Sequence, residues 1–189
     1  MKRCFVALVL CAMASAANAA GQRRIQQEFG FSVTFPPNLH VCVNGSWRHP
    51  HGWGAPLAGT CQKPRTDRAI AVIGNYNAEE FTSPQEAALC AEREIEAGAK
   101  LGLSFEGHKS ATCREDQPEG TVRITVVTRA RKQAEPDDGD HQTASFFYSA
   151  GLTTTPEKLK DDLIVFRHVL RSVHLHPESA TGPKPPFGF

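Results

Sequence analysis

The cysteines set the strongest limit on how this chain can fold. Two of the six lie in an apolar N-terminal leader, and the other four are Cys42, Cys61, Cys90 and Cys113. An even number of cysteines in an oxidising compartment predicts disulfides, and four cysteines allow three pairings. We favour Cys42–Cys61 and Cys90–Cys113, because each pair closes a short loop. A zinc site or a redox pair is the alternative, although the sequence has no C-x-x-C spacing.

The oxidising compartment follows from residues 1–19, which have the pattern of an export signal. A positively charged N-terminal region is followed by a short apolar run and by Ala17-Asn18-Ala19, the small-x-small motif that signal peptidase requires. We predict cleavage between Ala19 and Ala20. The apolar run is shorter than the roughly 20 residues that span a bilayer, so no membrane span is expected after cleavage. Lipidation at Cys11 is the alternative, but the preceding Leu10 is not small. The predicted location is the bacterial periplasm or the medium.

Length and charge restrict the class of protein. The full chain has 189 residues and a net charge of +1, and both Lys2 and Arg3 leave with the signal. A nearly neutral surface gives no counterion-release drive toward nucleic acid, so we expect no nucleic-acid partner. We predict one globular domain over 20–176, followed by a flexible tail over 177–189 that is rich in Pro and Gly.

The hydrophobic pattern predicts an α+β fold. Alternating or continuous apolar runs predict strands at 29–35, 39–43, 68–74, 121–128 and 142–150, and a further short strand ending at 113. The run over 68–74 is apolar on both faces, as in a central strand. Residues 44–67, rich in Gly, Pro and Trp, indicate a long irregular loop, and the charged residues 129–140 indicate a solvated hairpin tip rather than a binding finger.

Two main helices are expected beside the antiparallel sheet. Ser83-Pro84-Gln85-Glu86 is a capping box with Pro at the first position and predicts a helix over about 83–102. Pro156 opens a second helix over about 156–172. Its core-facing stripe consists of Leu159, Leu163, Phe166, Leu170 and Val173, widened by Ile164, Val165 and Val169.

The opening Phe31-Ser32-Val33-Thr34-Phe35-Pro36-Pro37 and the closing segment 166–175 resemble the PsbP-like α/β/α sandwich. The resemblance covers residues 29–175 and implies an antiparallel sheet between helices. Members of that fold are mostly non-catalytic, partner-binding or accessory proteins. This chain departs from them in its four cysteines and its loop of Trp and His residues, and no family binding residues can be carried over.

Motifs for a nucleophile elbow, a phosphate loop or a zinc protease are absent from the sequence, so we predict no catalytic residue, cofactor or metal. The candidate partner contacts are Trp47, His49, His51 and Trp53. Trp is enriched at interface hot spots, while two imidazoles two residues apart could instead share zinc or copper. The remaining alternative places both Trp rings against the edge of the core.

These features favour an exported, non-catalytic protein that binds a protein partner in the bacterial envelope, one form of which is an antagonist of a secreted toxin. The alternative is a periplasmic metal-binding protein or hydrolytic enzyme that uses the His49/His51 loop. The identity of the partner and the oligomeric state stay open at this stage.

Overall fold

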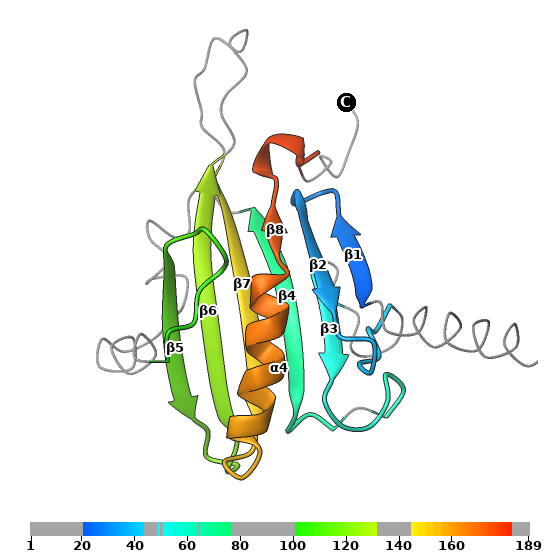
Figure 1. Ribbon diagram of the computed structural model, residues 1–189, viewed down its shortest axis with the longest axis vertical. Helices are drawn as coiled ribbons and strands as arrows, with labels where there is room; N and C mark the ends of the chain where they lie inside the picture. Colours follow the sequence, from blue (N-terminus) through cyan, green and yellow to red (C-terminus); the bar gives the residue numbers. More distant parts are fainter. Residues whose placement is uncertain are drawn as a thin grey trace, which may run out of the picture.

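In the computed structural model, residues 21–43, 49, 51–63, 65–76, 101–131 and 145–182 are described. Within them the chain forms eight strands, one α-helix and one short 3₁₀-helix (Figure 1). The strands are β1 (Gln22–Gln26), β2 (Phe31–Phe35), β3 (Gly52–Pro56), β4 (Ala69–Tyr76), β5 (Ser110–Asp116), β6 (Val122–Arg131), β7 (Ser145–Thr154) and β8 (His174–Leu175). The helices are α4 (Leu159–Arg171) and η1 (Pro177–Ser179).

Five strands form an antiparallel sheet in the order β3-β4-β7-β6-β5. Strand β4 pairs with β3 on one side and with β7 on the other, so the prediction of a central strand near residues 68–74 is confirmed. Strands β6 and β7 pair from Val122↔Thr154 to Arg131↔Ser145. The side chains that alternate toward one face, among them Ile70, Val72 and Leu152, are fully buried.

The remaining strands form a second antiparallel sheet in the order β1-β2-β8. The sequence led us to expect one sheet, and the structure corrects this to two. The reason lies in β2, where Phe31, Val33 and Phe35 are at most 1% exposed. Such burial is reached when one face of the strand lies against the broad sheet, so β2 packs across that sheet instead of extending its edge.

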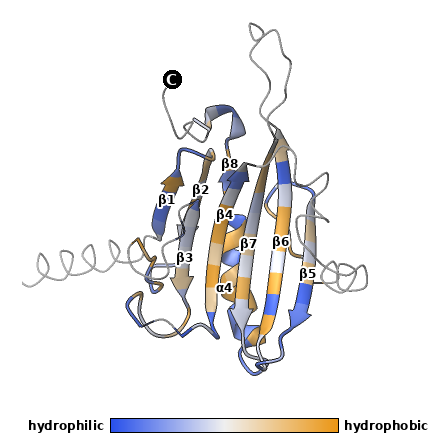
Figure 2. Cartoon of the chain, turned by 180° about the vertical axis from the view of Figure 1, so that it is seen from behind, coloured by the Kyte–Doolittle hydropathy of each residue, from blue (hydrophilic) through white to orange (hydrophobic). Residues whose placement is uncertain are grey.

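Helix α4 lies on the same face of the five-stranded sheet as β2 and β8 (Figures 1 and 2). Phe166 of α4 belongs to one continuous core cluster with Phe31 of β2 and with Ile124 of β6. The buried residues Leu163, Phe166 and Leu170 confirm most of the predicted stripe of this helix. Ile164 does not belong to it, because 63% of its surface is exposed.

The two-helix prediction is only partly supported, because α4 is the one α-helix among the described residues. The other predicted helix, 83–102, falls almost entirely on residues 77–100, which lie outside the described part of the chain. Helix α4 also begins at Leu159 and not at Pro156. Residues 156–158 form a turn in which the Lys158 amide donates to the Thr155 carbonyl at 3.0 Å.

The segment predicted as an irregular loop, 44–67, contains strand β3, whereas the predicted strand 39–43 is reduced to a single bridge between Cys42 and Gly54. Gly52, one of the glycines that indicated a loop, permits the strand pairing. A Cβ atom at Gly52 would collide with the Val72 carbonyl of β4, so only glycine permits this close approach.

The start of the predicted tail is packed against the domain. Ala180 is 3% exposed, the Thr181 amide donates to the Gln27 carbonyl at 3.1 Å, and the Gly182 amide donates to the Glu28 carbonyl at 3.1 Å. The chain therefore stays in contact with the β1–β2 turn as far as residue 182. Residues 183–189 lie outside the described part.

Candidate functional site: the disulfide-fastened end of β3

The Cys42–Cys61 disulfide joins the segments on either side of β3. The two Cα atoms are 5.4 Å apart, and this pairing confirms one of the two predicted bridges. The Cys42 amide also donates to the Gly54 carbonyl at 2.8 Å. Strand β3 thus has β4 on one side and, at Gly54, a covalently fixed segment on the other.

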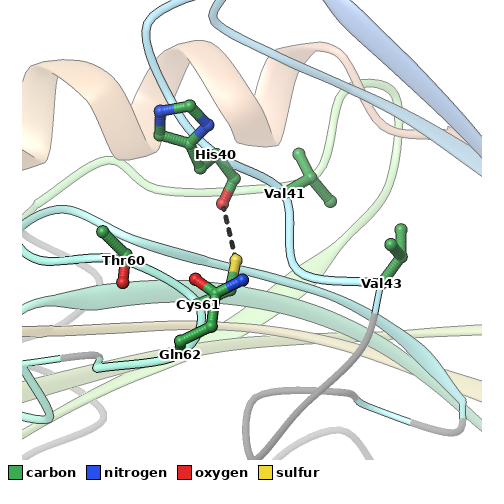
Figure 3. Close-up of a pocket in the computed structure, with 6 residues that line it drawn as sticks. All are labelled: His40, Val41, Val43, Thr60, Cys61 and Gln62. Carbon is green, nitrogen blue, oxygen red and sulfur yellow. Dashed lines mark hydrogen bonds between the residues drawn. The ribbon is translucent and has the colours of Figure 1, made fainter.

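A hollow of about 310 Å³ opens beside this disulfide (Figure 3). Its lining consists of His40, Val41, Val43, Thr60, Cys61 and Gln62. Val41 is buried, but Val43 exposes 46% of its surface at the rim. The hollow therefore combines an apolar wall with the polar side chains of Thr60 and Gln62.

Both sulfur atoms lie against the His40 carbonyl oxygen, at 3.8 Å for Cys42 and 3.7 Å for Cys61. The dashed line in Figure 3 marks the second of these contacts. A disulfide sulfur carries no hydrogen, so these are packing contacts and not hydrogen bonds. They place the His40 backbone over the disulfide while the imidazole is exposed to solvent.

Trp53 lies on β3 opposite Val72 and packs against the core. The guanidinium carbon of Arg24, from β1, is 5.8 Å from the centroid of the Trp53 ring, within the range of a cation–π contact. The structure thus gives Trp53 a packing role, which the sequence left open as an alternative to partner contact. Trp47 lies outside the described residues, and its partner contact stays a prediction.

The structure does not bring His49 and His51 together. His49 is half-buried and lines a hollow of about 320 Å³ with Ala71 and Ile73, on the face of the sheet turned away from α4. The His51 ring lies 4.9 Å from the ring of Phe29, a core residue on the other face. Burial lowers the pKa of His49 below its usual value, because desolvation disfavours the charged imidazolium.

Within the described ranges, no group of three or more His, Cys, Asp or Glu side chains lies close enough to hold a metal ion. Among the helices of the same ranges, none is both long and apolar enough to cross a membrane.

A buried ion pair holds the other end of the β3–β4 connection. Arg68 donates to Asp162 of α4 through two hydrogen bonds, Nε to Oδ2 at 2.9 Å and Nη2 to Oδ1 at 2.6 Å. The Thr154 hydroxyl donates to the same carboxylate at 2.5 Å. The side chain of Asp162 is only 4% exposed, so a buried carboxylate with three hydrogen bonds fixes the connection to α4.

Of the second predicted disulfide, only Cys113 is described. Cys113 is disulfide-bonded, and its sulfur partner lies outside the described residues. Cys90, Ala19 and Ala20 also lie outside them, so the Cys90–Cys113 pairing and the cleavage site stay predictions.

Sequence reasoning missed Val41, Val43, Thr60 and Gln62 as site residues. The sequence feature that could have revealed them is the predicted Cys42–Cys61 pair, because the neighbours of two bonded cysteines must lie close together. It also missed the Arg68–Asp162 pair, whose members are 94 positions apart and carry no local pattern.

The fold and this site define a disulfide-containing α+β domain with two antiparallel sheets and α4 on one face of the larger sheet. Disulfides of this kind are typical of proteins that work outside the reducing cytoplasm.

Comparison with known proteins gives a structural likeness but no sequence match. No family model matches the chain, and no curated protein sequence matches it. The structure resembles the solution structure of cyanobacterial PsbP (CyanoP) from Synechocystis sp. PCC 6803 with a TM-score of 0.39 and 14% sequence identity. The likeness covers 84% of this chain and 94% of that chain. A weak resemblance to the PsbP-like fold is thus found in the structure as in the sequence, and it extends to the fold alone.

Proposed function

We propose that the mature chain is an exported, non-catalytic protein that binds a protein partner in the bacterial envelope through the disulfide-fastened end of β3. The observation that carries the proposal is the hollow at Cys42–Cys61 with the exposed Val43 at its rim. A disulfide that fixes both walls in advance reduces the ordering cost of binding. The segment that leaves Val43 leads directly to Trp47, the aromatic anchor predicted from the sequence.

Antagonism of a secreted toxin is one form of this proposal. It is supported by the predicted export signal and by the absence of a recognisable catalytic motif from the sequence. The alternative use of His49 and His51 for metal binding or hydrolysis has no structural observation in its favour, since the two rings face opposite sides of the sheet.

The test compares two exposed aliphatic residues, one at the hollow and one on α4. Val43→Asp changes the rim of the hollow, and Ile164→Asp makes the same change on the outer side of α4, where 63% of the residue is exposed. Each tagged mature protein is used to capture partners from an envelope extract, and retained proteins are identified by mass spectrometry and then titrated in purified form.

We expect one protein to be retained by the wild type and by Ile164→Asp, and its affinity for Val43→Asp to fall at least tenfold. An equal set of captured proteins for all three forms would show that the hollow is not the contact surface. Melting curves of both variants should stay close to that of the wild type, because neither side chain is buried.

A further inference from the structure

Strand β1 is one edge of the smaller sheet, and the hydrogen bonds of β2 show which peptide groups of β1 are unpaired. On its other side β2 binds β8, where the Gly30 carbonyl accepts from the His176 amide at 2.7 Å and the Thr34 amide donates to the Ser172 hydroxyl at 3.0 Å. In an antiparallel strand, successive residues direct their peptide groups to alternate sides. Phe31, Val33 and Phe35 therefore bond to β1.

The residues opposite these three on β1 are Gln26, Arg24 and Gln22. The peptide groups of the two residues between them, Arg23 and Ile25, consequently point away from β2. No backbone hydrogen bond to Arg23 or Ile25 exists from any described residue on that open side. With respect to the described residues, β1 thus presents two N–H and two C=O groups without a backbone partner, the arrangement that an added strand requires.

The side chains next to this edge form a partly apolar surface. Ile25 is 58% exposed and borders a hollow of about 420 Å³ that reaches the β1–β2 turn and η1. Ser32, the cross-strand neighbour of Ile25, also lines it. Ser32 is only 2% exposed, yet its hydroxyl has no hydrogen-bond partner among the described residues. A buried hydroxyl without a partner is uncommon, and a ligand group in the hollow would satisfy it.

The charges on β1 indicate which kind of strand can pair with its open edge. Arg23 and Arg24 form no ion pair with a carboxylate within the described residues. Pairing of β1 with β1 of a second copy would bring these guanidinium groups close to their equivalents, and like charges directly opposite each other destabilise a sheet. The same charges attract a strand that carries a carboxylate.

We propose that β1 receives an extended segment of another protein as an added strand, with an aliphatic side chain beside Ile25 and an acidic side chain beside Arg23. Since Arg23 and Ile25 are two residues apart on one face, the two partner residues must also be two apart. This edge is separate from the hollow at Cys42–Cys61, and the inference does not depend on that hollow binding anything.

The probe is a phage-displayed library of random 12-residue peptides, selected against the folded mature protein. We expect the selected peptides to share an aliphatic and an acidic residue two positions apart. Ile25→Asp and Arg23→Glu should each weaken their binding at least tenfold, while Ile164→Asp, on the outer side of α4, should leave it unchanged. Selection against Arg23→Glu should replace the acidic residue of the peptides by Lys or Arg.

Amide hydrogen exchange gives a readout that does not depend on the variants. Bound peptide should slow the exchange of the Arg23 and Ile25 amides, and those of Gln22 and Arg24 should change less because they are already bonded to β2.

Three results would overturn the proposal. Selected peptides could bind Ile25→Asp and Arg23→Glu as tightly as the wild type. The wild type could form a dimer in sedimentation that Ile25→Asp abolishes, which would assign the edge to a second copy. Finally, the Arg23 and Ile25 amides of the free protein could be protected until residues 183–189 are deleted, which would assign the edge to the tail of this same chain.

Discussion

Strands β1 and β3 lie near each other at the same side of the molecule, yet they are held in place by different means. Strand β3 pairs with β4, meets Cys42 at Gly54, and is bracketed by the Cys42–Cys61 disulfide and the Arg68–Asp162 ion pair. Strand β1 has the ladder with β2 and the contact of Arg24 with Trp53. It is also mostly hydrophilic (Figure 2).

The comparison shows that the outer sides of the two strands are protected from unwanted pairing in different ways. On its outer side β3 meets Cys42 at Gly54, and the disulfide fixes this segment, so the neighbours of β3 can form a fixed hollow. The edge of β1 is left open and carries positive charge, which discourages pairing between copies but not with an acidic segment. The following predictions test how firmly each region is held.

The largest effect is expected at the ion pair that anchors the β3–β4 connection. Asp162→Ala leaves the Arg68 guanidinium without its carboxylate in a mostly buried position and should lower the free energy of unfolding by about 3–5 kcal/mol. Urea unfolding followed by circular dichroism measures this. Asp161→Ala, at the exposed neighbouring position, is the control and should change stability little. Equal losses for both variants would show that the ion pair does not contribute to the stability of the fold.

Removal of the disulfide should have the next largest effect. The two cysteines are 19 positions apart, and a loop of this length predicts a loss of about 3 kcal/mol for the double variant Cys42→Ala/Cys61→Ala. The loss should appear with faster exchange of the backbone amide at position 42, which bonds to the Gly54 carbonyl. An unchanged exchange rate at this amide would mean that the backbone pairing with Gly54, and not the disulfide, holds the segment against β3.

A smaller effect is expected in the β1–β2 turn. Gly30 has φ +59° and a Cβ there would collide with the His176 carbonyl, so Gly30→Ala should lower the free energy of unfolding by about 1–3 kcal/mol. Gly120→Ala is the matched control, because Gly120 has φ +82° but open space around its Cβ position. A thermal melt should show the larger shift for Gly30→Ala, and equal shifts would mean that backbone strain alone is responsible.

The smallest effect concerns pH and His49, beside β3. Burial lowers the pKa of His49 in the folded state, so the unfolded chain takes up a proton more readily as the pH falls. The pKa of histidine in the unfolded chain is about 6.5. The free energy of unfolding should therefore be highest above this pH and should decrease on acidification below it. His49→Gln should flatten this decrease in urea unfolding between pH 7.5 and 5, and His40→Gln, at an exposed position, should not.

The strands with regular apolar spacing were predictable from the sequence. Residues 121–128 and 142–150 alternate, and they appear as β6 and β7 with Val126 and Tyr148 buried. Strand β3 could not be found in this way, because Gly52 serves close pairing with β4 and the two glycines of the strand leave no hydrophobic period. Strand β1, QRRIQ, has only one aliphatic residue, and that residue is exposed.

The same limit applies to the candidate sites. Pairing Cys42 with Cys61 followed from their short separation along the chain and from the predicted export signal, and it located the hollow indirectly. The free groups of β1 could not be predicted, because which peptide groups are unpaired depends on the register of β2 with both of its neighbours.

By itself the sequence determined the α+β class and most of the core stripe of α4, and it favoured the Cys42–Cys61 pair, since each rests on residues close together along the chain. Only the tertiary structure decided that there are two sheets, that Arg68 meets Asp162, that His49 and His51 face opposite sides, and that β1 keeps an open edge. The physical reason is that burial and pairing between distant segments depend on how complete faces pack together. Local spacing shows that a face is apolar, but it does not show which other face will cover it.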